Sequence, residues 1–238
     1  MKIHPVTFNH LLTKISSLKN EHTQPHVYNV FVNDEKRLDE NVQEYVNIIK
    51  NLSKDELTIL DFGGGAGGHY KTLRENIPNK KLIYNIVENP KLLDRFIEHM
   101  ADYENVNYCG SINDFKEVHF DFVYANASPQ MLSPKRAVDI IKDLFSVGGE
   151  YVLLQRIIVS EGNVYDNFFT IANVGHGEQY FSITSDKHVL ELGEVFGYDL
   201  KYSEYQRPQP VQFKMKKDYN SDVGVICYKN YLFKKKYE

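Results

Sequence analysis

Apolar residues at helical spacing mark the beginning of the chain. Two groups repeat at intervals of three and four residues, which places each group on one face of a helix. They are Phe8, Leu11, Leu12 and Ile15, and then Val42, Tyr45, Val46, Ile49 and Leu52. We therefore expect residues 1–55 to form an N-terminal helical extension. Such an extension can cover a substrate site as a lid or form the contact of a homodimer, and the pattern fits both.

From Leu57 onward, short apolar runs alternate with amphipathic stretches. The runs predict buried strands at residues 57–60, 82–87, 106–109, 120–125 and 151–155. The stretches between them predict helices at residues 70–75, 91–100 and 134–145. Strands separated by helices pair in parallel through crossover connections. A doubly wound, mostly parallel sheet with helices on both faces is therefore expected.

The last part of the chain departs from this alternation. A helix is expected at about residues 186–196, followed by strands at 198–205 and 223–233 with no helix between them. Two such strands pair as an antiparallel hairpin at the sheet edge. The sequence thus predicts an α/β fold with a seven-stranded sheet over residues 56–238. The long stretch from Arg156 to Ser185 is expected to be a loop that covers the substrate.

Composition narrows the range of partners. With 28 basic and 32 acidic residues, the chain lacks the positive field that binds a phosphate backbone, so nucleic acid is not an expected partner. No apolar run approaches the ~20 residues that cross a bilayer, and two cysteines are too few for a disulfide framework. We expect a cytoplasmic protein without a membrane span. His22 and His26 have no further ligands nearby, so no metal site is predicted.

A glycine-rich loop follows the first of these strands. It contains Gly63, Gly64, Gly65 and Gly67, and glycine lets the backbone come close to a ligand because no Cβ intervenes. The spacing also satisfies the dinucleotide fingerprint, with Glu88 about 20 residues beyond the loop to bind a ribose. The loop alone therefore leaves NAD and S-adenosylmethionine open. Asp61 favours the second, because its carboxylate can bind the amino group of a methionine moiety and would repel a pyrophosphate.

With Asp61, the loop and the antiparallel C-terminal pair, residues 57–233 resemble the class I, seven-strand methyltransferases that use S-adenosyl-L-methionine. The resemblance implies that Asp61 and the loop glycines surround the methionine part of the cofactor. It also implies that Glu88, followed by Asn89, binds both ribose hydroxyls. Ser111 and Ile112 would flank the adenine, and Asn126 would begin the motif that faces the substrate, close to the cofactor.

A narrower resemblance adds an acceptor class. Three short motifs of this chain are similar to motifs in a group of methyltransferases: Asp-Phe-Gly-Gly-Gly, Val-Glu-Asn-Pro at 87–90 and Leu-Leu-Gln-Arg at 153–156. Members of that group tend to lie in bacterial gene clusters for surface polysaccharide, including capsule. This chain departs from the group by having Asn89 in place of glutamine. The resemblance implies methylation of a sugar hydroxyl or a phosphate-type decoration on a glycan or small-molecule precursor.

Methyl transfer to a hydroxyl needs a base, and histidine is the side chain best suited near neutral pH. His176 is the first candidate, because glycines flank it within the long stretch after the fifth strand. An ordinary surface histidine fits that position equally well. Glu178 can orient His176 or act as the base, and Arg156 can hold a phosphate or carboxylate of the substrate. His69 and Tyr70, just beyond the glycine loop, are secondary candidates.

Two other functions are compatible with these residues. An NAD-linked oxidoreductase would use the same glycine loop but leave Asp61 without a role. A module that binds the cofactor without any acceptor chemistry would not need His176, Glu178 or Arg156.

Overall fold

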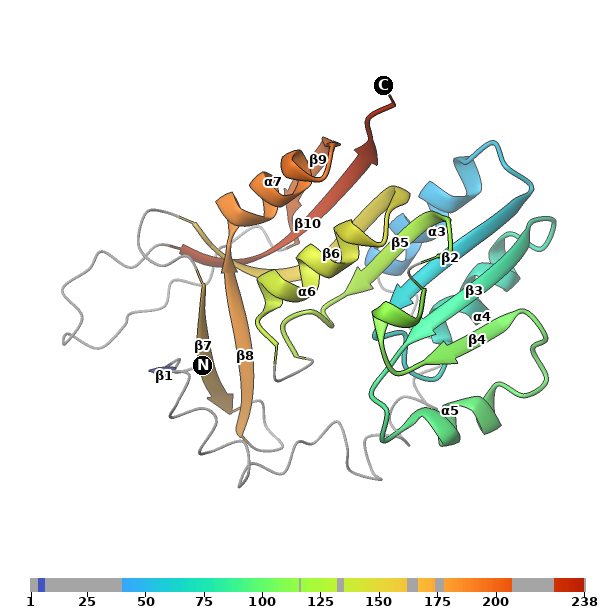
Figure 1. Ribbon diagram of the computed structural model, residues 1–238, viewed down its shortest axis with the longest axis horizontal. Coiled ribbons are helices and arrows are strands. Elements are labelled where there is room, and N and C mark those ends of the chain that lie inside the picture. Colours follow the sequence, from blue (N-terminus) through green and yellow to red (C-terminus); the bar gives the residue numbers. More distant parts are fainter. Residues whose placement is uncertain are drawn as a thin grey trace.

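A computed structural model describes the chain over residues 4–6, 40–115, 117–131, 135–161, 167–173, 178–206 and 225–237. Its centre is one mixed sheet of ten strands with helices on both faces (Figure 1).

The parallel part of the sheet carries the expected strands. Its order is β4 (Val106–Cys109), β3 (Lys81–Val87), β2 (Glu56–Phe62), β5 (Phe120–Asn126) and β6 (Gly149–Glu161). Because these strands are parallel, their carboxyl ends meet at one edge of the sheet. The residues of the glycine loop and those that follow β3, β4 and β5 are thereby brought to the same edge.

The C-terminal strands close one side of the sheet. β10 (Val225–Lys235) lies antiparallel beside β6, and β9 (Tyr198–Tyr205) lies antiparallel beside β10. The predicted parallel sheet and antiparallel C-terminal pair are both confirmed.

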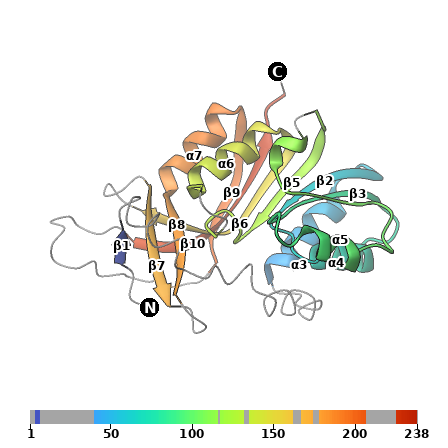
Figure 2. The ribbon, with the colours of Figure 1, turned by 60° about the horizontal axis from the view of Figure 1, so that its bottom comes forward.

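Helices cover the two faces of the sheet, as Figure 2 shows. The helices α3 (Glu40–Asn51), α4 (Gly68–Asn76) and α5 (Leu93–His99) lie on one face. The other face carries α6 (Ala137–Ser146) and α7 (Asp186–Val195), and the 3-10 helix η2 (Ile112–Phe115) packs into the same core.

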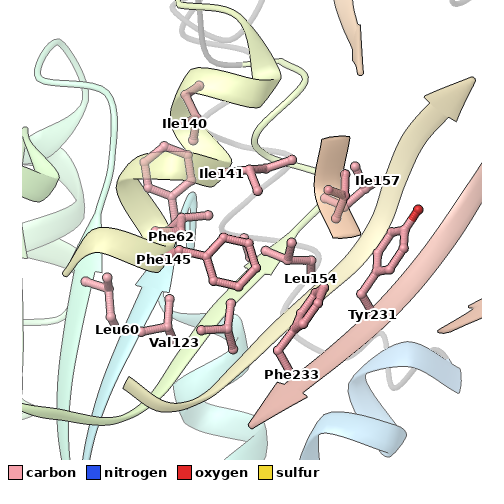
Figure 3. Packing of buried hydrophobic residues seen from close by; sticks show 14 of the residues in the cluster. Leu60, Phe62, Val123, Ile140, Ile141, Phe145, Leu154, Ile157, Tyr231 and Phe233 are labelled. Carbon is pink, nitrogen blue, oxygen red and sulfur yellow. The ribbon is translucent and has the colours of Figure 1, made fainter. Parts of the chain in front are cut away.

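The core between the sheet and α6 is built from aliphatic and aromatic side chains (Figure 3). Phe145 of α6 is 1% exposed, and its ring meets that of Phe233 edge to face, with centroids 5.0 Å apart. Leu154 and Val123, which lie under α6, are fully buried. Each side chain of this size stabilises the fold by about 1.5–3 kcal/mol through its removal from water.

The stretch expected to be a loop contains further strands. β6 continues to Glu161, and β7 (Asn167–Asn173) and β8 (Glu178–Ser185) follow as an antiparallel pair. β8 also pairs with β6 in parallel at Val159 and Ser160. The prediction of a loop there was wrong, because the β-branched and aromatic residues of these segments favour strands. β7 and β8 make the sheet larger than the expected seven strands.

The first residues also differ from the prediction. His4–Val6 form β1, a strand antiparallel to β7, in place of a helix. The apolar group from Phe8 to Ile15 lies outside the described residues. The second group forms α3 as predicted, and four of its members are buried: Val42, Tyr45, Val46 and Ile49. They share one core with β2 and β3, while the boundary at residue 55 stays a prediction.

We expect replacement of Ile49 by alanine to destabilise the whole domain, because the fully buried side chain belongs to the core beneath the sheet. The loss should be about 2–4 kcal/mol of unfolding free energy in urea denaturation. Gln43→Ala, on the exposed side of the same helix, should change stability by less than about 0.5 kcal/mol. Equal effects of the two substitutions would contradict the packing of α3 described here.

Candidate active site

The glycine loop makes a tight turn between β2 and α4. Gly63, Gly65 and Gly67 have φ angles of 75°, 56° and 77°, a left-handed conformation that side-chain-bearing residues rarely adopt. The amide of Gly63 donates to the carbonyl of Val87 at 2.8 Å, which ties the loop to the end of β3. The loop therefore has the shape that its sequence predicted.

Asp61 lies beneath this loop and is fully buried. Its Oδ2 accepts a hydrogen bond from the hydroxyl of Tyr84 at 2.9 Å and contacts Nδ1 of His69 at 2.9 Å. Burial and the charge of Asp61 raise the pKa of Tyr84, so its hydroxyl stays protonated and donates. A Cβ on Gly64 would stand 2.5 Å from the same Oδ2, so the loop packs directly on the carboxylate.

The second oxygen of Asp61, Oδ1, has no hydrogen-bond partner among the described residues. A buried polar atom without a partner costs free energy, and such atoms are uncommon in native proteins. The atom therefore points to a ligand with a hydrogen-bond donor or a positive charge at the glycine loop.

Glu88 follows β3, lies on the other side of the loop and is 9% exposed. Its Oε2 accepts from the amide of Gly65 at 3.0 Å, and Oε1 accepts from the amide of Asn89 at 2.7 Å. Burial raises the pKa of Glu88, and these two backbone hydrogen bonds act in the opposite direction. Each oxygen keeps a lone pair for a further donor.

A cavity of about 240 Å³ opens beside Glu88. The predicted residues Glu88, Asn89, Ser111 and Ile112 line one side of it. Phe62, Val87 and Pro90 add apolar wall. The structure thus brings together the residues expected to bind ribose and adenine, and the apolar wall suits a planar ring.

The sequence did not predict the residues that line the other side of this cavity. Ile140 and Asp143 of α6 line it, together with Lys135, whose Nζ lies 2.8 Å from Oδ2 of Asp143. Nothing in the local sequence marks these residues, since only the packing of α6 on the sheet brings them to the cavity.

Asn126 ends β5, Arg156 lies within β6, and the two side chains meet, while neither residue lines the cavity. Nε of Arg156 donates to Oδ1 of Asn126 at 2.6 Å. The backbone of Arg156 is held on both sides, by Asn230 Oδ1 at 2.9 Å and by Gln130 Nε2 at 2.8 Å. Asn126 was grouped with the cofactor residues, but its side chain contacts Arg156 and does not line the cavity.

Backbone strain is concentrated at the same place. Among the described residues, the non-glycine positions with positive φ are Ala127, at 56°, and Arg156, at 52°. The amide of Ala127 donates to the carbonyl of Gln155, the neighbour of Arg156, at 2.9 Å, so the two strained positions lie close together where β5 ends beside β6. Strained residues of this kind cluster at functional sites, which supports a role for Arg156.

The other four catalytic candidates have different outcomes. His176 lies outside the described residues. Glu178 is the first residue of β8, and only its backbone is described. His69 belongs to the site through its contact with Asp61. Tyr70 is 4% exposed and packs against the rings of Tyr84 and Tyr103, so it is a core residue.

Other chemistry finds little support in the described part of the chain. Burial raises the pKa of the Cys109 thiol to about 11, which disfavours a nucleophilic thiolate. Within the described ranges, no group of three or more histidine, cysteine, aspartate or glutamate side chains is arranged to hold a metal ion. None of the helices described is both long and apolar enough to cross a membrane.

Comparison with known proteins identifies the fold. The sequence matches no protein-family profile and no curated protein. Among solved structures, the chain is similar to the 1,6-didemethyltoxoflavin-N1-methyltransferase of Burkholderia thailandensis, solved with S-adenosylhomocysteine. The identity is 13%, coverage is 99% of this chain and 95% of that chain, and the TM-score is 0.56.

Two further structures have the same fold. The amino pentose methyltransferase of Micromonospora echinaspora, solved with S-adenosylmethionine, is 13% identical, with 84% and 92% of the two chains covered and a TM-score of 0.50. The glycopeptide N-methyltransferase MtfA, also solved with S-adenosylmethionine, is 11% identical, with 82% and 93% covered and a TM-score of 0.53. The chain therefore has the Rossmann-like fold of S-adenosylmethionine-dependent methyltransferases.

We expect Gly64→Ala to destabilise the protein, because the added Cβ would stand 2.5 Å from Oδ2 and 2.7 Å from Cγ of the buried Asp61. Overpacking of this kind costs about 1–3 kcal/mol, measurable by urea denaturation. Gly68→Ala is the matched control, since its Cβ would meet nothing within 4 Å. Equal stability of Gly64→Ala and the wild type would contradict the contact between loop and carboxylate.

Proposed function

We propose that the protein is an S-adenosylmethionine-dependent methyltransferase that methylates an oxygen of a polar, carbohydrate-related acceptor. The observation that carries the proposal is the pair of buried carboxylates on either side of the glycine loop, Asp61 beneath it and Glu88 beside it. The fold similarity supports the same cofactor, since the similar enzymes were solved with S-adenosylmethionine or S-adenosylhomocysteine.

The adenosine half of the cofactor fits the cavity beside Glu88. Both carboxylate oxygens of Glu88 retain acceptor capacity, which suits the two adjacent hydroxyls of a ribose. Ser111 and Ile112 lie further along the same cavity, where an adenine ring would meet its apolar wall.

The methionine half fits the glycine loop. The buried Oδ1 of Asp61 needs a donor, and the α-ammonium of the methionine moiety supplies a charged one. When bound, S-adenosylmethionine supplies an electrophilic methyl group on its sulfonium. The residues of the chain have to hold it and place an acceptor oxygen in line with that methyl.

An NAD-linked function is less well supported. A pyrophosphate at the glycine loop would approach the buried carboxylate of Asp61, and like charges in a buried site repel strongly. The similarity of fold to methyltransferases also favours S-adenosylmethionine over NAD.

Arg156 supports an acceptor with an anionic group. It lies within β6, beside the carboxyl end of β5, and Asn126 fixes its guanidinium through Nε. Arginine binds phosphate and carboxylate groups through its planar fork of donors, which suits a phosphate-type decoration or an acidic sugar. With the resemblance to enzymes from surface-polysaccharide gene clusters, we propose a cytoplasmic glycan precursor as acceptor, with His176 or Glu178 as the base.

Calorimetric titration tests the cofactor. We expect S-adenosylhomocysteine to bind in the micromolar range and NADH not to bind. Glu88→Gln should weaken the binding of S-adenosylhomocysteine by about tenfold or more, because hydrogen bonds to a charged group contribute about 1.5–3 kcal/mol. Lys54→Ala, whose ion pair with Asp121 lies at the start of β5, serves as control and should bind normally. Binding of NADH alone, or of neither ligand, would refute the proposal.

The acceptor is tested by turnover. The protein is incubated with labelled S-adenosylmethionine and a panel of nucleotide-sugars, phosphorylated sugars and neutral glycans. We expect methylation of an anionic member. Arg156→Gln should lower that turnover at least about tenfold through loss of a charge-assisted contact while leaving affinity for S-adenosylhomocysteine within about twofold. Unchanged turnover in Arg156→Gln would exclude this role for Arg156.

A further inference from the structure

A β-bulge interrupts the pairing of β6 with β10. Two residues of β6, Gln155 and Arg156, lie opposite the single residue Asn230 of β10. Leu154 before the bulge and Ile157 after it both belong to the core beside α6 (Figure 3), although residues three apart in a regular strand point to opposite faces. The bulge therefore adds one residue to the strand. Bulges of this kind redirect a side chain and are frequent next to active sites.

Two side-chain amides bind the backbone of Arg156 at this bulge. Its N–H donates to Oδ1 of Asn230 at 2.9 Å, and its carbonyl accepts from Nε2 of Gln130 at 2.8 Å. The φ angle of Arg156 is 52°, in the left-handed region that residues with a side chain rarely adopt. Contacts on both sides thus hold a conformation that an arginine in a strand would otherwise leave.

The amide of Asn230 is itself held in one orientation. Asn230 is 2% exposed, and its Nδ2 donates to Oδ1 of Asn41 at 3.1 Å and to Oε2 of Glu44 at 3.4 Å. Because a carboxylate only accepts, Nδ2 has to face Glu44 and Oδ1 has to face the N–H of Arg156. The same oxygen of Glu44 accepts from Nε2 of Gln155 at 2.6 Å. The first turn of α3 thereby sets the direction in which Asn230 binds the bulge.

We infer that Asn230 is a positioning residue for the acceptor. It holds Arg156 in the left-handed conformation that places the guanidinium beside Asn126, where the anionic group of the acceptor binds. The inference rests on the proposed function, in which Arg156 binds that group. Asparagine suits this position because one amide accepts from a backbone N–H and donates to a carboxylate. Alanine can do neither, and an ionised aspartate can only accept.

Inorganic phosphate is the probe that tests the inference, titrated by calorimetry into the protein saturated with S-adenosylhomocysteine. R156Q gives the reference for loss of the anion contact and should weaken phosphate binding at least about tenfold, as is typical for loss of a charged hydrogen bond. N230A should weaken it at least about fivefold, because Arg156 can then relax and its guanidinium loses its fixed place. The affinity of N230A for S-adenosylhomocysteine should stay within about twofold of the wild type.

A control and a rescue separate positioning from general stability. Tyr202 donates its hydroxyl to Glu44 in the same network, so Y202F should lower stability in urea but leave phosphate affinity within about twofold, since Asn230 still binds Arg156. N230D places a second buried carboxylate beside Glu44 and should weaken phosphate binding. The double variant N230D/E44Q removes that repulsion and restores a donor to residue 230, so it should recover most of the phosphate affinity.

The outcomes distinguish the inference from the proposed function. Unchanged phosphate affinity in N230A, or an equal loss of phosphate and S-adenosylhomocysteine binding in that variant, would overturn the role of Asn230 alone. If the wild type binds no phosphate, or R156Q binds it as tightly as the wild type, the proposed role of Arg156 is refuted and the inference with it. Failure of the wild type to bind S-adenosylhomocysteine would refute both as well.

Discussion

The glycine loop rests on the buried carboxylate of Asp61, and this contact determines how the rest of the site is arranged. Gly64 has to be glycine because a Cβ would collide with Oδ2 of Asp61. Tyr84 of β3 and His69 of α4 both contact that oxygen, so the carboxylate of Asp61 joins β2, β3 and α4. A carboxylate buried to this extent is costly to bury unless it is paired, and a bound cationic group would complete its pairing.

The site has a rigid part, at the glycine loop and Glu88, and a strained part, at Ala127 and Arg156. The glycine loop and Glu88 are fixed by backbone hydrogen bonds, so the cofactor side of the site is preorganised. On the side where we propose that the acceptor binds, the backbone is strained at Ala127 and Arg156, and a buried polar network lies beside it. Gln155, which precedes Arg156, donates to Glu44 at 2.6 Å and to the carbonyl of Asn41 at 3.0 Å. The start of α3 is thereby attached to the part of β6 that carries Arg156.

The sequence predicted most elements because their signals are local. The apolar run from Leu57 and the alternation after it gave the parallel strands, and two strands without an intervening helix gave the antiparallel pair of β9 and β10. Prediction failed between Arg156 and Ser185. Length alone was taken to indicate a loop, although the segments that form β7 and β8 are rich in β-branched and aromatic residues.

For the site, the sequence by itself indicated the glycine loop, Asp61 and Glu88, because Asp61 lies at the end of β2 and Glu88 follows β3, at spacings that suit the cofactor. Ser111, Ile112 and Asn89 were also found, since parallel strands bring their carboxyl ends to one edge. Only the tertiary structure decided that Asp143 reaches the cavity, that Asn126 binds Arg156, and that His69 contacts Asp61. Those contacts depend on how helices and strand ends pack and on side-chain directions, which a periodic pattern does not encode.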